Sequence, residues 1–251
     1  MNAIINKKSA VIVILVFTCF QTSAQNYSSK YEFGIATGTL VYQGDLTPAA
    51  LGSYKDARPS FQIFASKNLD NNFALRANFT RGHISGNDAW YSTPAYHQLR
   101  NFNFNTTVNE LSASLVWNFY NYNAAGTQRK LSAYIFGGAG LSFVKINRDW
   151  SKLNTAAMDP KSSLMTGLAV DTVHKLPGII PVIPLGVGVR YAVSQNLSLF
   201  AEGTYRITFS DYLDGFSKSV NPSSNDYYYG ISVGIVYHLS NNGLRCPRIK
   251  R

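Results

Sequence analysis

Strict alternation of apolar and polar residues constrains this chain more than any other feature of its sequence. The pattern runs through ELSASLVWNFY at 110–120, LSLFAEGTYRITFS at 197–210 and YYYGISVGIVYHL at 227–239. Aliphatic and aromatic residues fill every second position, while small, polar or charged residues fill most of the others. A period of two places the two sets on opposite faces of an extended chain. The alternation therefore predicts β-strands with one apolar face.

The pattern predicts eight strands, and the connections between them alternate in length. The predicted strands are 30–44, 57–67, 73–85, 108–122, 130–147, 182–194, 197–211 and 226–239. Connections after the second, fourth and sixth strands are short, whereas those after the other strands are long, with 86–107 and 148–181 among them.

The alternating loop lengths separate two all-β folds. A soluble β-sandwich has no reason to collect its short turns at one end. A membrane barrel has an even number of tilted antiparallel strands, short periplasmic turns and longer outer loops. The sequence therefore predicts an all-β fold, an eight-stranded antiparallel transmembrane β-barrel of the outer-membrane type.

The second face of the predicted strands carries charges of both signs. In a sandwich they would face water, but in a barrel they face the lumen and must pair there, because unpaired buried charge is costly. Three glutamates and three arginines balance, which predicts a polar network of Glu32, Arg76, Glu110, Arg190, Glu202 and Arg206. Eight strands leave an interior just wide enough for side chains, so we expect no open pore.

Aromatic residues gather near the ends of the predicted strands. Tyrosine and tryptophan favour the two membrane–water interfaces, where they form girdles around a barrel. The residues predicted to form these girdles are Tyr31, Tyr42, Trp117, Tyr120, Tyr191, Tyr212 and Tyr227.

The beginning of the chain has the three parts of a secretory signal. Lys7 and Lys8 precede an apolar stretch at 10–20, and small residues at 22–24 suit cleavage. We expect a signal peptide at 1–24. Cys19 leaves a lipoprotein open as an alternative, although the bulky Phe17 fits a lipid-attachment signal poorly.

The predicted barrel spans 25–240 and is followed by a basic tail at 241–251. An even strand number places both termini on the side of the short turns, the periplasm of a Gram-negative cell. The tail contains Arg245, Cys246, Pro247 and Arg248. Disulfides persist in the periplasm, and a lone cysteine in an exported chain indicates an intermolecular disulfide or a free thiol. We therefore expect these four residues to bind a periplasmic partner.

The formal net charge of +10 is spread along the chain. Basic residues of the outer loops, such as Lys152, Lys161 and Lys175, would meet outer-membrane lipids and anionic lipopolysaccharide. The export signal argues against nucleic acid as a partner. The sequence contains no metal, phosphate-loop or C-x-x-C motif, so we expect no cofactor and no metal.

Two candidate sites at the outer end of the predicted barrel have competing interpretations. Asp211, Asp214 and Asp226 could hold a cation, but their spacing fits no calcium-loop pattern, and a turn with capping aspartates explains them better. A lipid hydrolase could use His83 and Ser85, but the pair has no carboxylate to orient the histidine. We expect no enzymatic activity.

Three patches of the sequence resemble the PorG-like outer-membrane β-barrels. Asp211, Tyr212, Leu213 and Asp214 resemble the D-Y-L-D signature of that family, although Gly215 replaces the acidic residue that usually follows. The opening Y-E-F-G at 31–34 with Y-Q-G-D-L at 42–46 and the ending R-C-P at 245–247 are also similar.

The resemblance implies a component of the type IX protein secretion machinery. Barrels of that family associate with a periplasmic ring built from a lipoprotein and its partner, and they are not the export channel. Two alternatives stay open: an outer-leaflet lipid A hydrolase, and a structural barrel that binds surface ligands through its long loops.

Overall fold

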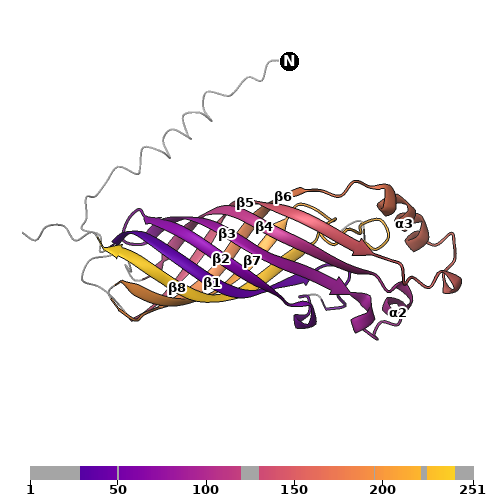
Figure 1. Cartoon of the computed structure of the whole chain (residues 1–251), viewed down its shortest axis with the longest axis horizontal. Coiled ribbons are helices and arrows are strands. Elements are labelled where there is room, and N and C mark those ends of the chain that lie inside the picture. The colour runs from indigo at the N-terminus through magenta and orange to yellow at the C-terminus, as the bar shows by residue number, and fades with distance from the viewer. Residues whose placement is uncertain (1–28, 50, 120–129, 195, 222–224, 241–251) are drawn as a thin grey trace, which may run out of the picture.

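Eight antiparallel strands close into a barrel in the order β1 to β8, which confirms the predicted fold class. The structure, a computed structural model, describes residues 29–49, 51–119, 130–194, 196–221 and 225–240. Strand β8 pairs with β1 from Tyr31↔Leu239 to Gln43↔Tyr227 and closes the barrel. The strands are β1 Ser29–Gln43, β2 Arg58–Asn68, β3 Phe73–Asn87, β4 Asn103–Asn118, β5 Leu131–Asp149, β6 Ile179–Ala192, β7 Leu197–Thr208 and β8 Tyr227–Ser240. Figure 1 shows the strands inclined to the long axis of the molecule.

The alternation of the sequence becomes an outer and an inner face. In β4, Leu111, Leu115 and Trp117 point outward with 53%, 49% and 45% of their surface exposed. Ser114 and Val116 lie between them and are buried in the lumen. An apolar band therefore surrounds the barrel, as the membrane-spanning fold requires.

Most strand boundaries lie close to the predicted ones, and β4 differs most. It begins at Asn103 instead of 108. The added segment still alternates, with Phe104 and Thr106 buried, but its outward residues Asn105 and Thr107 are polar. The prediction missed this part of the strand because it extends beyond the apolar band.

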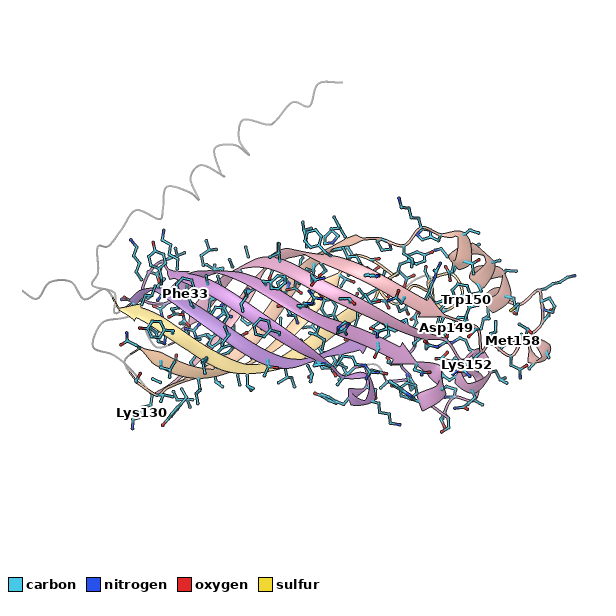
Figure 2. All side chains as sticks on the ribbon, in the orientation of Figure 1. Phe33, Lys130, Asp149, Trp150, Lys152 and Met158 are labelled. Carbon is cyan, nitrogen blue, oxygen red and sulfur yellow. The ribbon has the colours of Figure 1, made fainter. Side chains whose placement is uncertain are left out.

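The two ends of the barrel differ. Short connections at 69–72 and 193–196 lie at the end where β1 begins and β8 ends. The long connections 44–57, 88–102, 150–178 and 209–226 meet at the other end and are called the loop cap below. Figure 2 places Phe33 and Lys130 toward the short-turn end, and Trp150, Lys152 and Met158 at the loop cap.

The helices of the structure are short and belong to the loop cap (Figure 1). They are η1 Tyr54–Asp56, η2 Asp88–Trp90, α2 Tyr96–Arg100, η4 Thr155–Ala157 and α3 Ser163–Val173. None of the helices in the described ranges is long and apolar enough to cross a membrane.

The predicted aromatic girdles need correction. Tyr31, Trp117 and Tyr191 are exposed on the outer face, as expected for a girdle. Tyr42, however, is fully buried and points into the barrel, and Tyr212 lies in the loop cap against His174, with ring centroids 4.1 Å apart. The predicted signal at 1–24, the tail at 241–251 and Tyr120 lie outside the described residues.

Candidate functional site

Six charged residues of the inner face meet in the lumen as three ion pairs. Arg190 Nη1 lies 3.0 Å from Glu32 Oε2, and Arg206 Nε lies 2.6 Å from Glu110 Oε2. The third pair joins Arg76 and Glu202. All six side chains are buried. Each charge is therefore neutralised by an opposite charge from another strand, which reduces the cost of removing both from water.

Aromatic rings surround the guanidinium group of Arg76. Its Cζ lies 4.3 Å from the ring centroid of Phe64 and 5.2 Å from that of Phe136. The Tyr134 hydroxyl donates to Glu202 Oε1 over 2.7 Å. The Phe136 ring fits because the neighbouring strand has Gly186, where a Cβ would lie 2.3 Å from the ring. Cation–π contacts of this kind add to the stabilisation of a buried cation.

His238 belongs to the same polar network. Its Nδ1 lies 3.2 Å from Glu32 Oε1, and its Nε2 lies 2.9 Å from Ser198 Oγ. The sequence places His238 on the polar face but gives no sign of these partners, because they come from β1 and β7, far away in the chain.

The lumen has little room left between these side chains. A cavity lined in part by Gln62, Thr80 and Arg206 has a volume of about 10 Å³. A volume of that order holds about one water molecule. A folded or extended polypeptide therefore cannot pass through this part of the barrel.

The D-Y-L-D segment at 211–214 belongs to the loop cap and closes the loop-cap end of the lumen. Leu213 and Phe216 are buried, and Phe216 stacks on Phe102 with ring centroids 4.4 Å apart. The Leu213 carbonyl accepts a hydrogen bond from Thr106 Oγ1 over 2.8 Å. Gly215 adopts a φ of 87°, which lets the chain turn back as a glycine can and other residues rarely do. The connection between β7 and β8 thus folds inward.

Tyr42 binds two aspartates of this connection at once. Its hydroxyl lies 2.7 Å from Asp214 Oδ2 and 2.7 Å from Asp226 Oδ1. Asp214 Oδ1 also accepts the Phe216 N–H, and Asp226 Oδ2 accepts the Leu213 N–H. The aspartates therefore organise a turn, the interpretation that competed with a cation site. Within the described ranges no group of three or more His, Cys, Asp or Glu residues is arranged to hold a metal ion.

The two aspartates should make the loop cap sensitive to pH. Burial raises the pKa of Asp214 to about 8, and burial and the nearby Asp214 raise the pKa of Asp226. Since an unfolded aspartate titrates at about 3.9, the folded state binds extra protons between that value and about 8. The contribution of Asp214 to the free energy of unfolding therefore falls as pH rises through this window and levels off above it.

The variant Asp214→Asn should remove much of this pH dependence, because an amide resembles the protonated carboxyl. We expect the thermal midpoint of the wild-type protein to fall on going from acidic to mildly alkaline buffer, and that of Asp214→Asn to fall less. Asp159→Asn, at an exposed position of another loop, is the matched control. An equal decline of the thermal midpoint in all three proteins would contradict Asp214 as the source of the pH dependence.

A second cluster in the loop cap centres on Asp88. Its Oδ2 accepts Arg100 Nε over 2.6 Å and the Phe102 N–H over 3.0 Å, and its Oδ1 lies 2.6 Å from His97 Nδ1. Arg100 Nη2 also donates to the carbonyl of Asp45 over 3.2 Å, which joins the first and second long loops. Asp88, His97 and Arg100 are buried. Nothing in the spacing of these residues along the sequence marked them as a group.

Asp171 fastens α3 to the inward-folded connection. Its carboxylate accepts the N–H groups of Ser217, Lys218 and Ser219, and also the Ser219 hydroxyl over 2.7 Å. Burial alone would raise the pKa of Asp171, but these hydrogen bonds hold it below its ordinary value. Gly167 on the same helix allows the close approach, because a Cβ there would lie 2.0 Å from the Lys218 carbonyl oxygen.

The candidate hydrolase residues do not form a nucleophile–base pair with each other. Ser85 is buried, and its Oγ accepts Arg58 Nε over 2.7 Å. His83 Nδ1 lies 3.3 Å from Thr107 Oγ1. The nearby Asp88 is bound to His97 and Arg100 instead.

The predicted partner-binding residues Arg245, Cys246, Pro247 and Arg248 lie outside the described residues. The predicted loop motif at 211–214 lies within the cap, and its members have different surroundings. Leu213 and Asp214 are fully buried, whereas Asp211 and Tyr212 are partly exposed.

The chain is similar to several solved structures at low sequence identity. Neisserial surface protein A shares 19% identity over 83% of this chain and 97% of its own, with a TM-score of 0.42. The attachment invasion locus protein Ail of Yersinia pestis shares 8% identity over 84% of this chain and 99% of its own, with a TM-score of 0.43. The outer membrane enzyme PagL shares 12% identity over 83% of this chain and 99% of its own, with a TM-score of 0.38.

A protein-family model gives the family of the chain. No curated protein matches the sequence significantly. The model described as "Domain of unknown function (DUF6089)" matches residues 7–247. Because this match covers nearly the whole sequence, the chain belongs to the DUF6089 family.

Proposed function

We propose that this protein is an outer-membrane scaffold component of the type IX protein secretion machinery. The observation that carries the proposal is the closed interior, with ion pairs in the lumen and Leu213 and Phe216 packed within the loop cap. A barrel without a passage suits anchoring better than transport. The resemblance to PorG-like barrels at 31–34 with 42–46, at 211–214 and at 245–247 adds the particular machinery.

The short-turn end is the proposed docking face for the periplasmic ring. The turn at 69–72 is compact: Asp70 Oδ1 accepts the N–H groups of Asn72 and Phe73, each over 2.7 Å. Asn196 and the end of β8 are also joined, because the His238 N–H donates to the Asn196 carbonyl over 2.8 Å. A rigid platform of this kind loses little conformational entropy when a partner binds. The loop cap faces the cell exterior in this arrangement.

The tail supplies the proposed contact with the ring lipoprotein and its associated subunits. The thiol of Cys246 and a thiol of the partner lose two protons and two electrons to the periplasmic disulfide oxidant and form one disulfide. Pro247 restricts the backbone beside the cysteine. Arg245 and Arg248 attract an acidic surface on the partner.

Deletion of the gene tests the secretion role. We expect cargo of the type IX machinery to stay inside the cell, and the ring to separate from the outer membrane during fractionation. Expression of the wild-type chain should restore both. Normal cargo secretion in the deletion strain would refute the proposed function and favour a barrel that binds surface ligands.

The variant Cys246→Ser tests the covalent contact separately. On a non-reducing gel of outer membranes we expect a high-mass band for the wild-type protein that disappears with reductant and is missing in Cys246→Ser. Arg251→Ala, a change in the same tail that keeps the thiol, is the matched control and should retain the band. Only monomer in every lane would remove the disulfide from the proposal.

A further inference from the structure

A lateral groove crosses the outside of the barrel on strands β5 to β8. Its volume is about 810 Å³, within the range of about 300–1,000 Å³ that is usual for small-molecule sites. Gly203 on β7 forms its floor between Val187 on β6 and Ile231 on β8, which are its direct neighbours in register. A Cβ at Gly203 would meet no atom within 4 Å, so the space above this residue is open.

The connection between β1 and β2 forms the wall of the lateral groove at the loop-cap end. Leu51 and Tyr54 line the groove, and 73% and 65% of their surfaces are exposed. The Tyr54 ring meets Tyr229 of β8 edge-on, with centroids 6.3 Å apart. Gly52 holds the connection close to β1, because a Cβ there would lie 2.2 Å from the Tyr42 carbonyl oxygen. Large apolar side chains on a loop are therefore held over the side of the barrel.

The lateral groove is continuous with the membrane-facing surface, and this position decides whether water or lipid surrounds it. Leu185, Val187 and Ile231 line it and also belong to the exposed apolar face, with 44%, 62% and 49% of their surfaces exposed. No charged residue is among those that line the groove. The tyrosines that line the groove suit the membrane interface. Hydrocarbon, not water, is therefore the material that contacts this surface.

We propose that the lateral groove binds an acyl chain of one lipid from the membrane leaflet on the loop-cap side. The glycine floor lets the chain approach the backbone of β7, while Leu51 and Tyr54 cover it from the side of the loop. Within a bilayer the gain comes from packing against a fitting surface, because lipid tails are as apolar as the groove. The site therefore selects by shape, and the barrel retains this lipid longer than the lipids around it.

The variant Gly203→Phe tests the lateral groove with little risk to folding. The added ring enters open space and faces the membrane, so the barrel should still form. In native mass spectra of protein extracted in mild detergent, we expect the wild-type protein to carry one lipid that Gly203→Phe has lost. Leu111→Phe, on the outward face of β4 and away from the groove, is the matched control and should keep the lipid. Equal lipid occupancy in Gly203→Phe and wild type would overturn the proposal.

A photo-cross-linker identifies what lies in the lateral groove in the cell. With a benzophenone side chain at position Leu51, light should attach lipid to the protein, and the added Gly203→Phe change should sharply reduce that product. Cross-linking to another protein in place of lipid would overturn the proposal and make the groove a protein interface. This readout does not depend on secretion, so it stands or falls separately from the proposed scaffold role.

Discussion

Replacing Glu202 with alanine is expected to destabilise the folded barrel by about 3–5 kcal/mol, the usual cost of leaving one member of a buried ion pair without its partner. The guanidinium of Arg76 would stay in the lumen, fully buried, beside Phe64 and Phe136. The Tyr134 hydroxyl would lose its acceptor as well. Urea-induced unfolding in lipid vesicles, followed by the difference in gel mobility between folded and unfolded barrel, measures the loss.

A double variant separates the effect of charge from the effect of lost volume. Arg76→Met combined with Glu202→Leu removes both charges, so we expect it to cost less than Glu202→Ala alone, because no charge remains unpaired. Arg81→Ala on the exposed face of β3 is the control for the loss of an arginine and should change stability little. If the double variant is as unstable as Glu202→Ala, the ion pair is not the source of the effect.

The lumen could be predicted from the sequence because it depends on local periodicity. Once a strand alternates, each charged residue is assigned to a face by its position, and Glu202 and Arg206 fall on the inner face of β7 together. The balance of three positive and three negative charges then requires pairing. Which glutamate meets which arginine depends on the register and on the positions of distant strands, which the alternation of a single strand does not give.

The prediction of Tyr42 as a girdle residue was wrong, although the same periodicity indicates its place on the inner face. Tyr42 lies an even number of positions after Glu32 along β1, so it falls on the inner face, and the structure buries it there. The girdle assignment relied on its position near the end of the strand. Counting the period from Glu32 would have placed the Tyr42 ring inside the barrel, although not against Asp214 and Asp226.

The loop cap could not be predicted because its contacts join separate connections. Asp171 binds Ser219, and Arg100 binds Asp45, across long intervals of sequence. Loop residues have no period, and aspartates are also common in ordinary turns. The turn at Gly215 could be anticipated from local chemistry, whereas its inward direction depends on the packing of Leu213 and Phe216.

Replacing Asp88 with asparagine should open the second long loop while the barrel stays folded. The carboxylate binds Arg100 through two nitrogen atoms, over 2.6 and 2.7 Å, and also holds His97. An amide of the same size keeps one acceptor but brings N–H groups toward the arginine and removes the neutralising charge. Breaking a buried pair of this kind costs about 3–5 kcal/mol. Since the loop can open without the strands, the cost should appear as local unfolding.

Trypsin reports this opening directly, because Arg100 is itself a cleavage site and only 2% of its surface is exposed in the folded protein. If cleavage follows the open population, the Asp88→Asn change should raise its rate after Arg100 by on the order of 100-fold or more. The detergent-solubilised protein should keep the gel mobility of a folded barrel. Asp159→Asn removes an exposed aspartate that accepts the Lys161 N–H, and cleavage after Arg100 should not change in that variant. Equal cleavage after Arg100 in Asp88→Asn and wild type would mean that the contacts of Leu213 and Phe216 hold the cap closed without the Asp88 cluster.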